Sequence, residues 1–167
     1  EGGVLKAFTE IGCKVVGVDL EPSRVEKAEK YMQQYVDAGL ARFIAKNIYD
    51  VDFEKDFANQ FDVIILKDSI EHIPEQEKII AQLKKYLAKD GVIFFGFPPW
   101  YMPFGGHQQI CKNKWLSKLP YYHLLPLPIY KWLLKRNNEN VAEMLEIRET
   151  KISIEQFERY SAQTNYN

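Results

Sequence analysis

Apolar positions along the first part of the chain alternate between a helical period and short continuous runs. A first amphipathic helix is predicted to end at Gly12, with four apolar residues on one face: Val4, Leu5, Phe8 and Ile11. Lys14–Asp19 is then an apolar run typical of a buried parallel strand. A second helix is predicted from Pro22 to about Asp37, with Ser23 and Glu26 spaced as a capping box.

The same alternation continues to residue 97. Strands are predicted at 41–46, 61–67 and 92–97, with a weak helix around 54–58 between the first two. A longer helix is predicted from Pro74 to a stop at Asp90-Gly91. This order of elements predicts an α/β fold with a parallel sheet.

Residues 98–150 interrupt this rhythm with many prolines and aromatic side chains. Short helices are predicted there at 113–119, 127–135 and 138–147, and a last helix follows from Ser153 to about Gln163, with Gln156 completing a capping box. We therefore expect three parts: a cofactor-binding core at 1–97, an aromatic-rich substrate lid at 98–150, and a return to the core at 151–167. Because no strand follows before Asn167 and the chain opens on a glycine pair, we expect the first strand and the last strands of the sheet to be lacking.

Composition narrows the class of protein. The 167 residues are 46% hydrophobic and carry a net charge of −1, so the chain can bury a core and is not a disordered segment. Because 22 basic residues are balanced by 23 acidic ones, we expect no nucleic-acid partner. Cys13 and Cys111 form no paired motif, which favours the cytoplasm. The sequence contains no apolar run of the roughly 20 residues that cross a bilayer.

Candidate ligand contacts follow the predicted strands, because ligands of parallel α/β sheets bind at the carboxyl ends of strands. Gly2 opens the first helix, where the backbone can approach a ligand closely. Asp19 ends the first predicted strand and is placed to accept both hydroxyls of a ribose, although it could also simply stabilise the turn before Pro22. Asn47 and Ile48 follow the next strand, at a position suited to an adenine.

Four segments in order carry a family resemblance: Glu1-Gly2-Gly3, Gly17-Val18-Asp19-Leu20, Phe61–Ile64 and Ile70-Glu71-His72-Ile73. Together they resemble the class I S-adenosylmethionine-dependent methyltransferases, in particular the small-molecule group that includes quinone-biosynthesis O-methyltransferases. The resemblance covers residues 1–97 and the helix after Ser153. It implies a Rossmann-like, doubly wound and mostly parallel sheet in a three-layer αβα arrangement.

The resemblance also implies cofactor contacts at particular positions. Glu1 and Gly2 match the end of the glycine-rich motif that holds the methionine part, and Asp19 matches the acid that binds the ribose. Leu20 and Ile48 match apolar residues beside the adenine, and Asn47 stands where the family usually has Asp. The backbone carbonyl of Lys67 matches the position that meets the methionine amino group.

Two histidines are candidates for the proton transfer that an oxygen acceptor requires. His107 follows the fourth strand and His72 lies in a Glu-His pair, whereas His123 is interpreted as structural. Asp68, Glu71, His72 and His107 resemble the divalent-metal site of certain small-RNA and quinone O-methyltransferases. Many relatives carry Glu-His without a metal, so our expectation is that no metal is used, with these four residues as the alternative.

The lid segment indicates the kind of acceptor. Trp100, Tyr101 and Phe104 are candidates for contacts with a flat, apolar or amphipathic molecule of quinone, lipid or glycan type, although the rings could equally pack the lid onto the sheet. Basic residues scattered through 112–136 could meet a phosphate or headgroup or form a solvated face, so transient membrane contact stays open. The sequence allows a monomer or a homodimer.

Two other classes remain as alternatives. A non-catalytic or degenerate cofactor-binding module would keep the same sheet. An NAD-dependent oxidoreductase would share Asp19, but the chain has no Tyr-x-x-x-Lys pair and Glu71-His72 would go unexplained.

Overall fold

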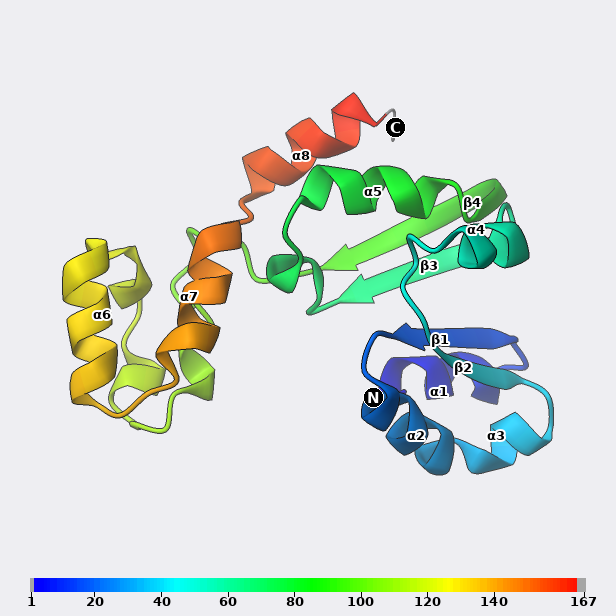
Figure 1. The fold of residues 1–167 in the computed structure, drawn as a ribbon, viewed down its shortest axis with the longest axis horizontal. Helices are drawn as coiled ribbons and strands as arrows, with labels where there is room; N and C mark the ends of the chain where they lie inside the picture. Colours follow the sequence, from blue (N-terminus) through cyan, green and yellow to red (C-terminus); the bar gives the residue numbers. More distant parts are fainter. Residues whose placement is uncertain (1, 165–167) are drawn as a thin grey trace. The chain divides into compact units, whose positions relative to one another are not determined.

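The computed structural model describes residues 2–164, which divide between Ala58 and Asn59 into two compact units (Figure 1). The elements of the first unit are α1 (Gly3–Glu10), β1 (Val15–Asp19), α2 (Pro22–Tyr31), α3 (Gln33–Asp37), β2 (Ala41–Ala45) and α4 (Val51–Phe57). Those of the second are β3 (Phe61–Lys67), η1 (Ile70–His72), α5 (Gln76–Lys84), β4 (Leu87–Gly96), η2 (Gln108–Ile110), η3 (Leu116–Lys118), η4 (Tyr122–Leu124), α6 (Leu127–Arg136), α7 (Val141–Thr150) and α8 (Ile154–Gln163). The α/β class is confirmed, whereas the division at 97 and 150 stays a prediction.

In the first unit, β1 and β2 pair in parallel, from Val15 opposite Ala41 to Asp19 opposite Ala45. Helices α1, α2 and α3 pack on this pair, and Met32 is completely buried between the two later helices. Gly17 is required in β1 because a Cβ there would lie 2.5 Å from the Phe43 ring. The strands and helices are therefore held together mainly by apolar burial.

Two details of the predicted second helix are wrong. It is divided into α2 and α3 at Met32, and the capping box is absent, because Glu21 rather than Ser23 is the N-cap. Pro22 takes the first helical position, which suits its fixed φ and missing N–H. The Ser23 hydroxyl instead donates to Glu21 Oε1 at 3.2 Å.

In the second unit, β3 and β4 also pair in parallel, with Lys67 opposite Gly96. The predicted helix stop at Asp90-Gly91 is wrong, because α5 ends at Lys84 and those residues lie inside β4. There they form a bulge: Asp90 has a φ of 63°, and the pairing jumps from Phe61–Leu87 to Val63–Val92. A Cβ on Gly91 would lie 2.8 Å from the Phe61 carbonyl oxygen, so the bulge needs glycine.

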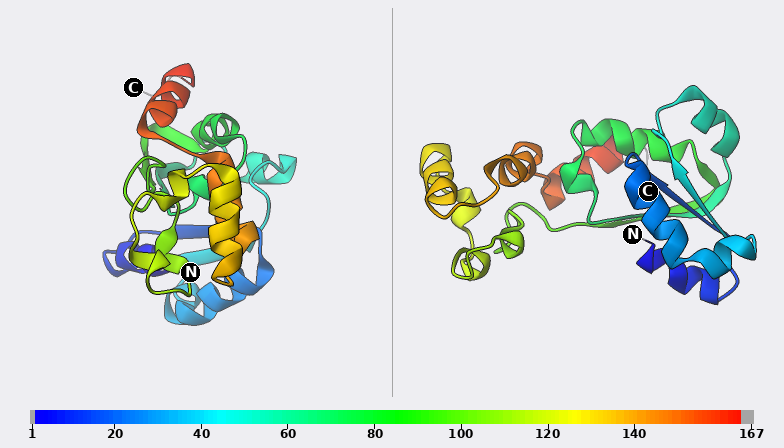
Figure 2. Two further views of the ribbon diagram at one scale, coloured as in Figure 1. Left: turned by 90° about the vertical axis from the view of Figure 1, so that its left-hand side faces the viewer. Right: turned by 60° about the horizontal axis from the view of Figure 1, so that its bottom comes forward.

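The lid segment, residues 98–150, has a small core of its own. Tyr130 and Leu134 of α6 are fully buried with Leu116, Tyr122 and Met144. Helix α6 lies at the end of this unit farthest from β3 and β4 (Figure 2).

Helix α8 returns to the sheet and begins with the predicted capping box of Ser153 and Gln156, which is confirmed. Its Phe157 packs on Phe95 and Phe97, with ring centroids 4.9 and 5.3 Å apart. Among residues 2–164, no helix has both the length and the apolarity needed to cross a membrane.

Candidate active site

The carboxyl end of β3 carries the first candidate residues. The Lys67 carbonyl accepts a hydrogen bond from the Ser69 hydroxyl at 3.0 Å, and the Lys67 ammonium lies 3.6 Å from the Asp68 carboxylate. Asp68 has a φ of 50°, a left-handed conformation that few residue types adopt. The turn that follows β3 directs the chain into η1.

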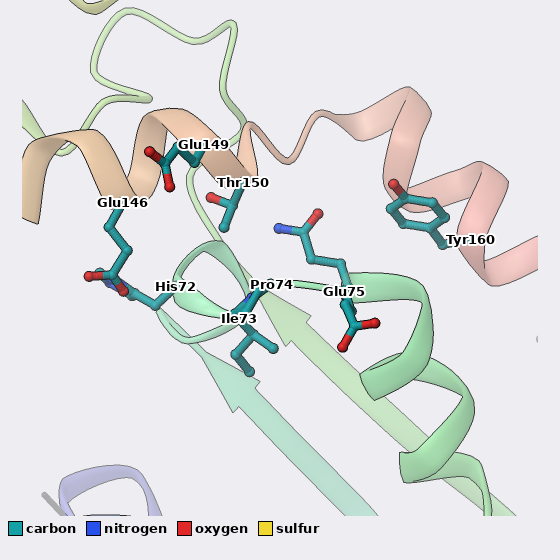
Figure 3. Close-up of a pocket in the computed structure, with 9 residues that line it drawn as sticks. His72, Ile73, Pro74, Glu75, Glu146, Glu149, Thr150 and Tyr160 are labelled. Carbon is teal, nitrogen blue, oxygen red and sulfur yellow. The ribbon is translucent and has the colours of Figure 1, made fainter.

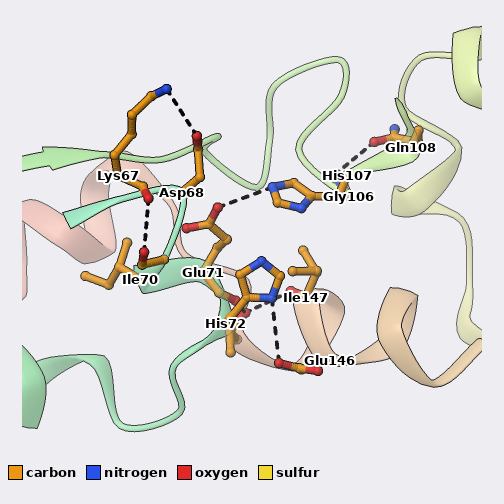
Figure 4. A network of polar contacts seen from close by, with 12 residues as sticks. Lys67, Asp68, Ile70, Glu71, His72, Gly106, His107, Gln108, Glu146 and Ile147 are labelled. Carbon is orange, nitrogen blue, oxygen red and sulfur yellow. Dashed lines mark hydrogen bonds and ion pairs between the residues drawn. The ribbon is translucent and has the colours of Figure 1, made fainter. Parts of the chain in front are cut away.

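Helix η1 presents a buried carboxylate. Glu71 is 1% exposed, and its Oε1 lies 3.3 Å from Nε2 of His107 (Figure 4). Neither carboxylate oxygen has a hydrogen-bond partner among the described residues, so the ion pair with His107 is the one interaction found for them there. The His72 ring lies edge-on to that of His107, with centroids 5.3 Å apart. We call Glu71, His72 and His107 the acid–histidine cluster.

Backbone contacts fix the position of this cluster. The Thr150 hydroxyl of α7 donates to the Glu71 carbonyl at 2.5 Å, and the Gln76 amide donates to the Ile70 carbonyl at 3.1 Å. His107 precedes η2 with a φ of 54°, which is strained for a non-glycine residue. Such strain is often found at functional sites.

The cluster has the donor atoms of a metal site. One ligand atom from each of its three residues lies within 4.8 Å of the others, and the Glu71 carboxylate oxygens have no hydrogen-bond partner among the described residues. A carboxylate with two imidazoles suits a divalent transition metal, so the residues fit such an ion. Asp68, the fourth residue of the metal alternative, is paired with Lys67 and does not belong to this cluster.

A cavity of about 500 Å³ opens on the other side of His72, between η1, α7 and α8 (Figure 3). His72 Nδ1 lies 3.6 Å from the Glu146 carboxylate at its wall. Glu75 and Glu149 also line it, so its charge is predominantly negative. His72 therefore lies between an acidic cavity and the buried Glu71.

The first unit holds the predicted nucleoside contacts, and Glu1 lies outside the described residues. Gly2 is the N-cap of α1 with a φ of 76°, so glycine is favoured there. The Asp19 carboxylate accepts from the Glu21 amide at 2.9 Å and lies 3.8 Å from Arg24. It thus stabilises the turn, as one interpretation expected, while its 38% exposed side chain remains accessible.

The remaining nucleoside candidates are less buried. Asn47 accepts a hydrogen bond from the Tyr49 amide at 3.0 Å, which closes a turn typical of Asn. Leu20 is 70% exposed and Ile48 is half-buried. Apolar side chains at these positions leave surface on which a flat ring could pack.

The three aromatic lid candidates have different surroundings. Trp100 is buried, its backbone N–H donates to the Ile152 carbonyl, and its ring lies edge-on to His123 at 4.7 Å. Tyr101 is 65% exposed and Phe104 is half-buried. Of the three rings, Tyr101 offers the most surface to a ligand.

His123 is structural, as expected. Its ring is fully buried between the Gln108 amide at 2.6 Å and the Trp100 carbonyl at 2.7 Å, and burial lowers its pKa. The Arg148 guanidinium donates to the His123 carbonyl and lies over the Trp100 ring. This network joins the loop after β4 to α7.

Sequence reasoning missed two residues that support the cluster, Thr150 and Glu146. Both lie on α7, about 75 residues after the residues they contact. The one local signal for them is their spacing at positions i and i+4, which places them on the same side of a helix.

Comparisons with known proteins agree with the resemblance. The model of the family described as "Methyltransferase domain" matches residues 1–143. The chain is 31% identical over 99 residues to the ubiquinone biosynthesis O-methyltransferase of Actinobacillus pleuropneumoniae serotype 7 (strain AP76), covering 56% of this chain and 41% of that protein. It is 28% identical over 95 residues to the sterol 24-C-methyltransferase of Debaryomyces hansenii, covering 57% of this chain and 23% of that protein.

Among solved structures, the chain resembles the YcgJ protein from Bacillus subtilis, with 13% identity, a TM-score of 0.44, and coverage of 92% of this chain and 68% of the other. The chain spans less than half the length of the curated relatives given above. The family model, however, matches most of the chain. The chain therefore belongs to the methyltransferase domain family, the class I S-adenosylmethionine-dependent methyltransferases, with their Rossmann-like α/β fold.

Proposed function

We propose that this protein transfers the methyl group of S-adenosylmethionine to an oxygen of an apolar or amphipathic small molecule of quinone, lipid or glycan type. The match of the family model to residues 1–143 carries this proposal. The O-methyltransferase names of several relatives support oxygen as the acceptor atom. The sterol C-methyltransferase among the relatives also acts on an apolar molecule, but at carbon, so it supports the acceptor class more than the atom.

When bound, S-adenosylmethionine would supply a methyl already activated on a sulfonium: the acceptor oxygen would bond to this carbon, the carbon–sulfur bond would break, and S-adenosylhomocysteine would be the product. The protein's task is to hold the acceptor in line and to remove its proton. We assign the removal of this proton to His107, whose ring is 3.3 Å from the buried Glu71. A carboxylate at that distance stabilises the imidazolium that forms.

Cofactor contacts are assigned from the family resemblance, position by position. The methionine part is assigned to Glu1, Gly2 and the Lys67 carbonyl, and the ribose to Asp19. The adenine is assigned to the residues Leu20, Asn47 and Ile48. The acceptor is assigned to Trp100, Tyr101 and Phe104, with Tyr101 offering the most exposed ring.

His72 is assigned an auxiliary role in the acid–histidine cluster. Its ring contacts that of His107, and its Nδ1 faces Glu146. If a divalent metal takes part, Glu71, His72 and His107 would hold it, and its charge would lower the pKa of an acceptor hydroxyl. Our proposal is proton transfer without a metal.

Calorimetric titration of the protein at its full natural length with S-adenosylmethionine and with NAD tests the proposed class. We expect binding of S-adenosylmethionine, and Asp19→Ala should weaken it by roughly 10- to 100-fold, because a hydrogen bond to a charged group contributes about 1.5–3 kcal/mol. Glu21→Ala, in the same turn, is the matched control and should leave the affinity nearly unchanged. Binding of NAD alone would contradict the methyltransferase function.

Cofactor binding without methyl transfer to any acceptor in a metabolite screen would favour the non-catalytic alternative.

Both cysteines are free thiols, which supports a cytoplasmic location. A monomer or a homodimer is compatible with the proposal, and light scattering would decide between them.

A further inference from the structure

Charge is distributed very unevenly along this nearly neutral chain. Residues 91–138 contain no Asp or Glu but carry six basic residues, namely Lys112, Lys114, Lys118, Lys131, Lys135 and Arg136. All of them except the half-buried Lys131 are exposed. A net charge of −1 for the whole chain thus conceals a cationic segment within the lid.

The same segment also exposes apolar side chains. Ten of the twenty exposed large hydrophobic residues found among the described residues lie between positions 101 and 132. On α6, Leu127, Ile129 and Trp132 are 41%, 50% and 59% exposed. An exposed apolar patch on a folded protein commonly marks an interaction surface.

Helix α6 combines both features on one side. Its buried side consists of Tyr130 and Leu134, which fix its orientation in the lid core. The side turned away from them, which we call the α6 face, presents two apolar and two basic residues: Ile129, Trp132, Lys135 and Arg136. The Arg136 guanidinium lies 5.7 Å from the centroid of the Trp132 ring.

A neighbouring loop extends this surface. The Asn113 amide donates to Asn137 Oδ1 at 2.7 Å, which holds residues 112–118 beside the C-terminal end of α6. Trp115 in this loop is 87% exposed, and exposed Lys114 precedes it. Each of these two exposed tryptophans therefore has a basic neighbour, Arg136 beside Trp132 and Lys114 before Trp115.

We propose that the α6 face docks on the surface of an anionic lipid bilayer. Tryptophan favours the boundary between headgroups and acyl chains, and lysine and arginine are attracted to anionic headgroups. At ten residues α6 is too short to span a bilayer, so it would contact the interface through its outward side chains while Tyr130 and Leu134 stay in the lid core. Ile129 offers no surface for stacking on bases, which favours lipid over nucleic acid.

Docking would bring the lid to the phase in which apolar acceptors dissolve, so it deepens the proposed function. Binding to lipid nevertheless requires neither cofactor nor methyl transfer. Co-flotation with vesicles therefore tests the docking separately from the catalytic proposal.

The experiment uses vesicles of phosphatidylcholine alone and vesicles that also contain phosphatidylglycerol. We expect the protein to float only with the anionic vesicles and to be released by added salt, which screens surface charges. Tryptophan emission should shift to shorter wavelength on binding, and Trp132→Phe should remove part of the shift. Trp100 is buried and should not contribute.

The decisive variant is Lys135→Glu/Arg136→Glu, and Lys27→Glu/Lys30→Glu on exposed positions of α2 changes the net charge equally. The first should lower vesicle affinity by at least about 30-fold, because each basic residue near an anionic surface contributes about a factor of five. The second should change it little, and both should keep the melting temperature of the parent. Equal loss in both variants, no flotation with anionic vesicles, or binding to RNA instead of vesicles would each overturn the proposal.

Discussion

Replacing His107 by alanine should lower the free energy of unfolding of the second unit by more than the loss of the His107 packing contacts alone would. Glu71 is 1% exposed and His107 is the one described side chain that faces its carboxylate, so the substitution leaves this buried group without a partner. Leaving a buried polar group without its partner typically costs about 1–3 kcal/mol. Because the His107 side chain is 12% exposed and water can reach part of it, we expect the lower end of that range.

Glu71→Gln gives the complementary measurement. It removes the buried charge while keeping the size of the side chain, so it should cost about 1–3 kcal/mol. In the double variant no buried charge is left behind by the loss of His107. Its cost should therefore fall below the sum of the single costs by about 0.5–3 kcal/mol.

Urea unfolding followed by tryptophan fluorescence is the suitable assay, because the three tryptophans, Trp100, Trp115 and Trp132, all lie in the second unit. His72→Ala is the matched control, since His72 is 38% exposed and pairs with Glu146 at the surface, where an ion pair contributes about 0–1 kcal/mol. Equal costs for the two histidine variants, or strictly additive costs in the double variant, would refute the reasoning.

Three further predictions concern the metal, a helix cap and acidity. Chelation with EDTA should leave methyl transfer unchanged; a loss restored by a divalent metal would instead assign the acid–histidine cluster as its ligands. Ser153→Ala should cost about 1 kcal/mol in urea unfolding, because it removes the N-cap bond to the Gln156 amide, whereas an unchanged midpoint would show that the cap is dispensable. Burial lowers the pKa of His123 below 6.5, so the unfolded chain binds this proton more readily and stability should fall as the pH drops below 6.5. His123→Gln should weaken that dependence, and an identical pH profile would contradict it.

Local sequence signals were sufficient where neighbouring residues determine the structure. The four strands follow from short apolar runs, and the start of α8 follows from the spacing of Ser153 and Gln156. The position of Gly2 at the start of α1 follows from its ability to adopt a positive φ.

The failures occurred where distant residues compete with local preference. Asp90-Gly91 resembles a helix stop, yet pairing with Phe61 draws Leu87 into β4 and turns the two residues into a bulge. The sequence placed Glu71 near His107 through a family resemblance alone. Its burial and missing hydrogen bonds depend on packing across 36 positions, which no local pattern encodes.

The bulge in β4 also determines where the chain tolerates changes in length. Beyond it, Val92 and Phe94 are exposed on one face, while Phe95 packs on Phe157 on the other. Loss of one residue between 92 and 96 would exchange the two faces and turn Phe95 away from α8. Loss of one residue between 88 and 90 would shorten an irregular segment, keep Gly91 and keep the alternation downstream, so deletions should accumulate there and be absent from the rest of the strand.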